Sequence, residues 1–131
     1  MIRRTIVAAL LALAAGLSLG ALASAADKKP FDPAAFEAAQ AAGKPILVEV
    51  TAPWCPTCKA QAPILSQLRG EPRFKDLVSF NIDFDSQKDL LKKFDVRMQS
   101  TLIVFKGPRE TGRSTGDTNP TSIGALLAKA I

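Results

Sequence analysis

The stretch ILVEVTAPWCPTCKAQAPIL, residues 46–65, contains both cysteines of the chain and decides how the chain folds. Its opening residues, 46–51, are apolar or β-branched except for Glu49, a composition that predicts a buried β-strand. From Cys55 to about Leu68 the apolar residues recur at helical spacing. We therefore predict a strand that leads directly into a helix, with the two cysteines in the first turn of that helix.

Two cysteines this close together could form a redox couple, half of a metal site or a structural disulfide. The 131-residue chain has no histidine, which excludes Cys-His nucleophile systems and imidazole ligands. Two cysteines alone cannot complete a four-thiolate zinc site within one chain. A disulfide that closes so short a loop stabilises a fold only weakly. The redox couple is therefore the favoured interpretation.

The start of the helix gives the two sulfur atoms different roles. Unpaired backbone N–H groups and the positive end of the helix dipole stabilise an anion there. Cys55 is therefore expected to ionise readily and to be the exposed nucleophile. Cys58 lies one turn later on the same side of the helix, where it is expected to be the shielded, resolving thiol.

The amino-terminal residues 1–25 have the layout of a secretory signal peptide. Two arginines precede an apolar run from Ile6 to about Leu22, and the small-residue triplet Ala-Ser-Ala ends at Ala25. We predict cleavage after Ala25, a single mature domain over 26–131, and export to the periplasm of a Gram-negative bacterium. The alternative is an uncleaved membrane anchor with the domain facing the periplasm.

Charge gives little support for nucleic-acid binding. The chain has 17 basic and 12 acidic residues, and two of the basic residues belong to the predicted signal peptide. The remaining lysines and arginines are scattered along the sequence rather than clustered. We therefore expect no nucleic-acid partner.

The rest of the chain alternates predicted helices and strands. We expect a brief edge strand at 29–31, a helix from Asp32-Pro33 to Gly43, a strand at 78–83, an amphipathic helix over 86–96, a strand at 101–105, a polar edge strand at 109–116 and a last helix opened by Asn119-Pro120. An early βαβ crossover followed by a hairpin predicts an α/β fold. Its central mixed sheet should be flanked by helices on both faces.

The same residues resemble the thioredoxin family. The stretch at 46–65 is similar to the thioredoxin active-site strand and helix, including Trp54 and Lys59. The segments FNID and DVRMQSTLIVFKG follow in the family's order, as does Gly116 before the final helix, so the resemblance covers nearly the whole mature chain. It implies a thioredoxin fold and a thiol–disulfide oxidoreductase with Cys55 as nucleophile and Cys58 as resolving thiol.

Glu49 is unusual because an unpaired carboxylate in a buried strand is costly. The resemblance places it beneath the resolving cysteine, where it is expected to accept and return the proton of Cys58. A purely structural role in an ion pair is the alternative. The lysine that accompanies this acid in thioredoxins corresponds here to Ser79, so Glu49 is expected to lack a cationic neighbour.

Ser100 departs from the family pattern. Thioredoxins have a cis-proline at this position, but a cis bond before a non-proline residue costs about 3–4 kcal/mol, so we predict a trans Gln99–Ser100 bond. The residues expected to contact substrate are Trp54, Pro56, Thr57, Gln99, Ser100 and Thr101. A different loop shape leaves open a second function, a redox-impaired binding or assembly factor that acts as a chaperone or bridges a metal cluster between two chains.

The function predicted from the sequence is an exported thiol–disulfide oxidoreductase that acts through Cys55 and Cys58, as a reductant rather than an oxidant. Its partners would be cysteine-containing exported proteins and a membrane-bound or periplasmic thiol reductase that donates electrons. We expect a monomer without a cofactor.

Overall fold

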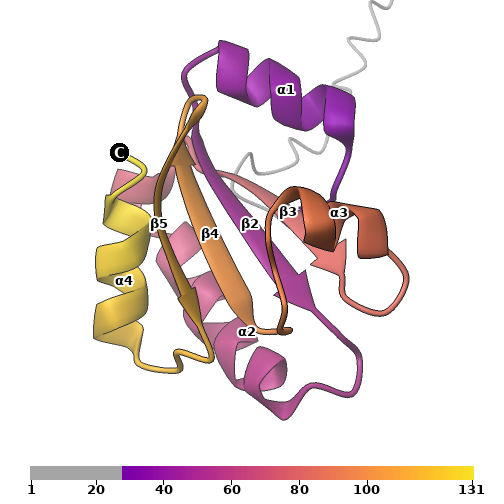
Figure 1. Cartoon of the computed structure of the whole chain (residues 1–131). Helices are drawn as coiled ribbons and strands as arrows, with labels where there is room; N and C mark the ends of the chain where they lie inside the picture. Colours follow the sequence, from indigo (N-terminus) through magenta and orange to yellow (C-terminus); the bar gives the residue numbers. More distant parts are fainter. Residues whose placement is uncertain (1–27) are drawn as a thin grey trace, which may run out of the picture.

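The computed structural model describes residues 28–131 (Figure 1). The predicted signal peptide and the first two residues of the predicted mature domain lie outside the described residues. The strands are β1 (Lys28–Pro30), β2 (Pro45–Thr51), β3 (Val78–Asp83), β4 (Thr101–Lys106) and β5 (Arg109–Thr115). The helices are α1 (Pro33–Ala41), α2 (Pro56–Arg69), the 3-10 helix η1 (Pro72–Phe74), α3 (Lys88–Lys93) and α4 (Pro120–Ala128). None of the described helices has the length and apolar character needed to span a bilayer.

The five strands form one mixed sheet with the order β1-β3-β2-β4-β5. β1 and β2 each pair parallel with β3, whereas β4 pairs antiparallel with both β2 and β5. The unit β2–α2–β3 is the predicted parallel crossover, and β4–β5 is the predicted hairpin. The structure confirms the predicted α/β fold with a central mixed sheet.

Helices cover both faces of the sheet, and each face has its own apolar core (Figure 1). Side chains of α1 and α3 pack on one face, and those of α2 and α4 pack on the other. Successive residues of a strand point to opposite faces, so Val48 of β2 belongs to the first core and Leu47 to the second. The same alternation directs Glu49 toward the face that α2 covers.

The starts of α1 and α4 follow the capping signals in the sequence. Asp32 caps α1, because its Oδ1 accepts a hydrogen bond from the N–H of Ala34 at 3.1 Å. Asn119 caps α4 in the same way through the N–H of Thr121 at 2.8 Å. A proline follows each cap, at a position where its missing N–H costs nothing.

Helix α3 is shorter than the helix that the sequence predicts over 86–96. It spans only Lys88–Lys93, because Asp95 adopts a left-handed φ of +51° that ends the helix. The N–H of Val96 then donates to the carbonyl of Leu91 at 2.8 Å, as in a Schellman cap. Glycine is the usual residue at this position, so the aspartate gave no stop signal in the sequence.

Candidate active site

Cys55 and Cys58 form a disulfide at the start of α2, with their Cα atoms 5.3 Å apart. Cys55 is the N-cap residue of α2, and its Sγ accepts a hydrogen bond from the backbone N–H of Cys58 at 3.0 Å. Pro56 occupies the first helical turn, where proline is preorganised for a helix. A thiolate at this sulfur would receive the same N–H and the positive end of the helix dipole.

Both cysteines are enclosed in this oxidised form. Cys55 is 0% exposed and Cys58 7% exposed, and Ala52 and Phe84 pack beside them. The prediction that Cys55 would be the exposed sulfur is therefore wrong for the disulfide state. The packing of Ala52 and Phe84 encloses the pair, and the N–H of Cys55 donates to the carbonyl of Ala52 at 3.1 Å in the turn before α2.

Trp54 is held beside the disulfide yet remains 54% exposed. Its indole N–H donates to Oδ2 of Asp85 at 2.9 Å, and its ring meets that of Phe84 edge-on with the centroids 6.4 Å apart. Of the other residues predicted to contact substrate in this segment, Pro56 is exposed and Thr57 is half-buried. All three predicted contact residues of this segment are thus at least partly accessible to a partner.

The loop before β4 and the cysteine pair both contact the carbonyl oxygen of Val50 on β2. The described residues contain no cis peptide bond, so the Gln99–Ser100 bond is trans, as predicted. Ser100 has a φ of +58°, a left-handed conformation that non-glycine residues rarely adopt. Its N–H donates to the carbonyl of Val50 at 2.8 Å, and Sγ of Cys58 lies 3.9 Å from the same oxygen.

Thr101 is the last of the predicted contact residues, and its hydroxyl is already engaged. It donates to the carbonyl of Met98 at 2.8 Å and lies 3.0 Å from Oγ1 of Thr115, so it closes the loop onto β5. These residues line a shallow pocket of about 290 Å³. Met98, which also lines this pocket, is 54% exposed, as is Trp54.

Glu49 has a cationic partner that the sequence did not predict. It is 3% exposed, and Arg69 at the end of α2 forms an ion pair with it. Arg69 also donates to Oγ of Ser79 at 3.2 Å, and Nζ of Lys28 lies 3.8 Å from the other Glu49 oxygen. The prediction that Glu49 lacks a cationic neighbour is therefore wrong, because the long side chain of Arg69 on α2 reaches the carboxylate and the hydroxyl of Ser79.

Two side chains of this region were absent from the predicted site. Arg69 gave no local signal, since it lies 20 positions from Glu49. Gln61 did give one, because it stands three residues after Cys58 and four before Leu65, on the buried face of α2. A glutamine on an otherwise apolar helix face, 2% exposed, calls for hydrogen-bond partners.

The acidic residues near the site are tied to backbone and indole groups. The N–H of Asp85 donates to Oδ1 of Asp83 at 2.9 Å. Within residues 28–131, the Cys, Asp and Glu side chains form no group of three that could hold a metal ion.

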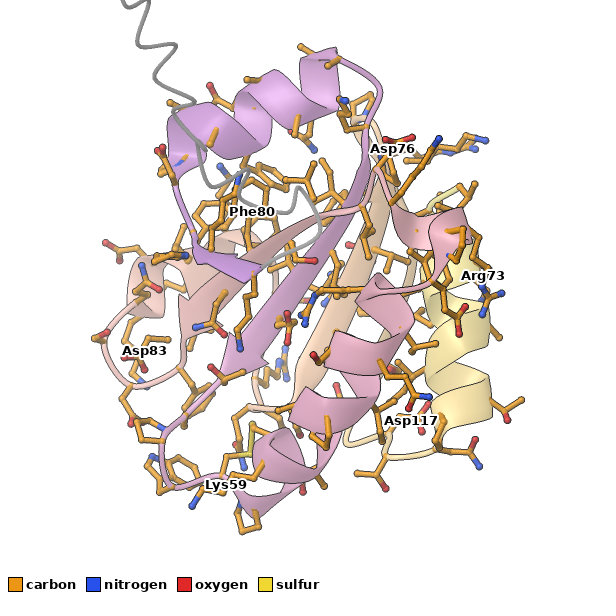
Figure 2. The ribbon with its side chains drawn as sticks, turned by 180° about the vertical axis from the view of Figure 1, so that it is seen from behind. Lys59, Arg73, Asp76, Phe80, Asp83 and Asp117 are labelled. Carbon is orange, nitrogen blue, oxygen red and sulfur yellow. A yellow bond between two sulfur atoms is a disulfide. The ribbon has the colours of Figure 1, made fainter. Side chains whose placement is uncertain are left out.

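Figure 2 shows Lys59, Asp83 and Asp117 toward the end of the molecule where α2 begins, and Asp76 toward the opposite end.

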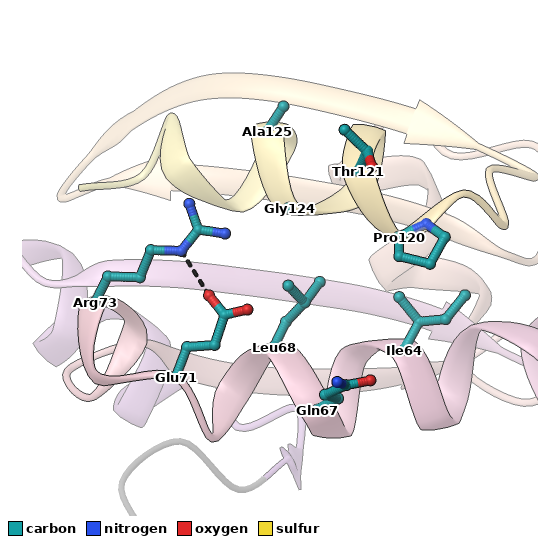
Figure 3. A pocket seen from close by; sticks show the side chains of 9 residues that line it. All are labelled: Ile64, Gln67, Leu68, Glu71, Arg73, Pro120, Thr121, Gly124 and Ala125. Carbon is teal, nitrogen blue, oxygen red and sulfur yellow. Dashed lines mark hydrogen bonds and ion pairs between the residues drawn. The ribbon is translucent and has the colours of Figure 1, made fainter.

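A separate groove of about 450 Å³ lies between α2 and α4 (Figure 3). Ile64 and Pro120 lie at one end of it, and the ion pair of Glu71 with Arg73 lies at the other. None of its nine lining residues belongs to the predicted site. The groove is thus distinct from the cysteine pair.

Comparison with known proteins identifies the family. The family model described as Thioredoxin matches residues 27–129. The chain belongs to the thioredoxin family. Thioredoxin-2 of Saccharomyces cerevisiae is 31% identical over 97 residues, which cover 73% of this chain and 90% of the yeast protein. A thioredoxin H-type of Brassica campestris is 34% identical over 81 residues, but the match spans 62% of this chain and only 64% of the plant protein.

Solved structures of thioredoxins and related proteins share the fold. The crystal structure of Trxlp from Edwardsiella tarda has a TM-score of 0.75 and 44% identity, and the match covers 77% of this chain and 98% of that one. Malassezia sympodialis thioredoxin matches with a TM-score of 0.68 at 18% identity, over 79% of this chain and 91% of that one, which shows the fold alone. The predicted family and fold are confirmed, and the cysteine pair supports thiol–disulfide oxidoreductase chemistry.

Proposed function

We propose that the chain is an exported thiol–disulfide oxidoreductase that reduces disulfides in cysteine-containing extracytoplasmic proteins. The observation that carries this proposal is the capping of α2 by Sγ of Cys55, which receives the N–H of Cys58. The signal-peptide layout of residues 1–25 supports export. The exposed side chain of Trp54, the residue that precedes Cys55, suits a protein substrate.

The reaction proceeds in two exchanges. The Cys55 thiolate attacks one sulfur of the substrate disulfide, a mixed disulfide forms, and the other substrate sulfur leaves as a thiolate. Cys58 then attacks Sγ of Cys55, the mixed disulfide breaks, and the second substrate thiolate leaves. Two electrons pass to the substrate, and the Cys55–Cys58 disulfide of the present structure is the product.

Glu49 accepts the proton that Cys58 loses before the second exchange, and a water can connect the two groups. Its ion pair with Arg69 fixes the carboxylate on the α2 side of β2. A membrane-bound or periplasmic thiol reductase then returns two electrons and two protons to the pair. The protein works as a monomer throughout, because both thiols come from one chain.

Reduction of insulin tests the reaction. We expect the reduced protein to cleave insulin disulfides, Cys55→Ser to abolish the activity, and Cys58→Ser to accumulate a mixed disulfide with the substrate. A folded wild-type protein that reduces no disulfide would overturn the proposal and support the binding or assembly factor. Purification as a coloured, iron-loaded dimer would support the cluster-bridging form of that alternative.

The direction of electron flow is tested by the reduction potential of the cysteine pair. A potential near about −270 mV is expected for a reductant, and a value near about −120 mV would identify an oxidant instead. Equilibration with glutathione buffers and quantification of the two forms gives this value.

Export is tested by expressing the full chain in a Gram-negative host. We expect the protein in the periplasmic fraction with an amino terminus at Ala26, determined by mass spectrometry. An uncleaved chain in the membrane fraction would support the anchored alternative. A chain that stays in the cytosol would contradict export.

A further inference from the structure

Gln61 on α2 is hydrogen-bonded to two loops, the one before β4 and the one before α4. It lies one turn beyond Cys58 on α2 and is 2% exposed, and a buried amide is costly unless it is hydrogen-bonded. Its Nε2 donates to the carbonyl of Ser100 at 3.2 Å and to the carbonyl of Asp117 at 2.9 Å. Both hydrogen atoms of the side-chain amide are thus used, one for the loop before β4 and one for the loop before α4.

Ser100 needs such support because its φ of +58° is strained for a residue with a Cβ. A strained residue keeps its conformation only where the surroundings fix it. Here the N–H of Ser100 donates to Val50 at 2.8 Å, and its carbonyl accepts from the N–H of Gly116 at 3.0 Å as well as from Gln61. Two of these three hydrogen bonds join backbone groups, and the third comes from the side chain of Gln61.

The conformation of Ser100 determines how the loop before β4 lies beside the disulfide. The carbonyl that accepts its N–H, that of Val50, lies 3.9 Å from Sγ of Cys58. Gln99 precedes it, and within the described residues no hydrogen bond occupies its backbone N–H or C=O. Free backbone groups of this kind can pair with an extended polypeptide.

We propose that Gln61 is a positioning residue that locks Ser100 in its left-handed conformation and thereby presents the backbone of Gln99 to polypeptide substrates. The inference rests on the proposed function and adds a selectivity to it. A polypeptide disulfide must align with the loop before its sulfur meets Cys55, whereas a small disulfide needs only access to the sulfur. Loss of the Gln61 hydrogen bonds should therefore weaken the reaction with polypeptides alone.

Gln61→Leu tests this proposal, since leucine fills a similar volume without donating hydrogen bonds. For insulin we expect kcat/KM to fall about tenfold through a rise in KM, the effect of losing one or two neutral hydrogen bonds. For hydroxyethyl disulfide we expect rates within about twofold of the wild type. Gln67→Leu, the same change at an exposed position of α2, is the matched control and should alter neither rate.

A rescue experiment separates positioning from a general loss of structure. Ser100→Gly removes the strain of the left-handed conformation, so adding it to Gln61→Leu should recover most of the insulin activity. Amide hydrogen exchange should show faster exchange of the N–H of Gly116 in Gln61→Leu and slower exchange again in the double variant. Gln61→Met takes the place of Gln61→Leu should the latter fail to fold.

The outcomes distinguish the two proposals. Equal losses for insulin and hydroxyethyl disulfide in Gln61→Leu, or no loss for either, would overturn the role of Gln61. Failure of Ser100→Gly to recover insulin activity would also overturn it. A wild-type protein that reduces neither disulfide would instead overturn the proposed function.

Discussion

At position 49 the chain buries a carboxylate, and the cation that balances it stands 20 positions later. A buried charge is costly unless it is both paired and hydrogen-bonded. The Arg69 side chain is 11% exposed, so its ion pair with Glu49 is little screened by solvent. Lys28 is 37% exposed and contributes less to the pairing. Arg69 is therefore expected to be the residue on which the burial of Glu49 depends.

Arg69→Met should lower the free energy of unfolding of the oxidised protein by about 3 kcal/mol, because it leaves the buried carboxylate poorly paired. Urea denaturation measures the change. The double variant Glu49→Gln with Arg69→Met should lose less than the sum of the two single variants, since it removes both charges.

Arg97→Met is the control for this substitution. Its ion pair with Asp95 is exposed, with side chains 89% and 86% accessible, so no measurable loss of stability is expected. Additive losses in the Glu49 and Arg69 variants would contradict a direct coupling between the two residues.

Among the elements, α3 shows how a helix can end without glycine. Asp95 adopts the left-handed conformation, and Arg113 of β5 donates to the carbonyls of Phe94 at 2.9 Å and Asp95 at 3.2 Å. A hydrogen bond to Glu110 raises the pKa of the Arg113 guanidinium, and a positive charge is favourable at the carboxyl end of a helix. The cap and the arginine together fix the beginning of the loop that leads to Ser100.

Asp95→Gly should raise the free energy of unfolding by about 1 kcal/mol, because glycine adopts the left-handed conformation without strain. The same substitution inside α3, Asp89→Gly, should lower it by about 0.5–1 kcal/mol through the poor helix propensity of glycine. Thermal unfolding followed by circular dichroism compares the two. Changes of the same sign in both variants would contradict the proposed strain at Asp95.

At the scale of the whole molecule, the sheet separates two cores with different tasks. The core under α1 and α3 contains a cluster of phenylalanines around Phe36. The centroid of the Phe36 ring lies 5.2 Å from that of Phe31, 5.9 Å from that of Phe80 and 5.4 Å from those of both Phe94 and Phe105. The core under α2 and α4 supports the helix that carries the cysteines. Phe84 packs against both the first core and the cysteine pair, whereas Phe36 belongs to the first core alone. We therefore expect that stability can be reduced at Phe36 without changing the geometry of the second face.

Phe36→Ala should lower the free energy of unfolding by about 3–5 kcal/mol, since it empties the centre of the aromatic cluster. The rate of insulin reduction per folded molecule should stay unchanged. Phe36→Leu gives a milder loss for the same comparison, and Glu37→Ala, its exposed neighbour on α1, should change neither quantity. A slower reaction in folded Phe36→Leu would contradict the independence of the two faces.

Local sequence patterns were sufficient to predict most of the elements and the position of the cysteines. Helix caps such as Asp32 and Asn119, the apolar strand at 46–51 and the spacing of Cys55 and Cys58 act within a few residues of one another. Local periodicity and capping are therefore sufficient to predict them. The mixed sheet followed from their order, because a βαβ crossover and a hairpin permit few arrangements.

The partners of the buried polar groups could be identified only from the folded chain. Arg69 reaches Glu49 across the packed interface of α2 and β2, and Gln61 reaches Ser100 over 39 positions of sequence. Such pairings depend on how a helix lies on a sheet and on where flexible side chains extend, and neither leaves a periodic pattern in the sequence. The burial of Cys55 was decided in the same way, because enclosure is a property of everything packed around a residue.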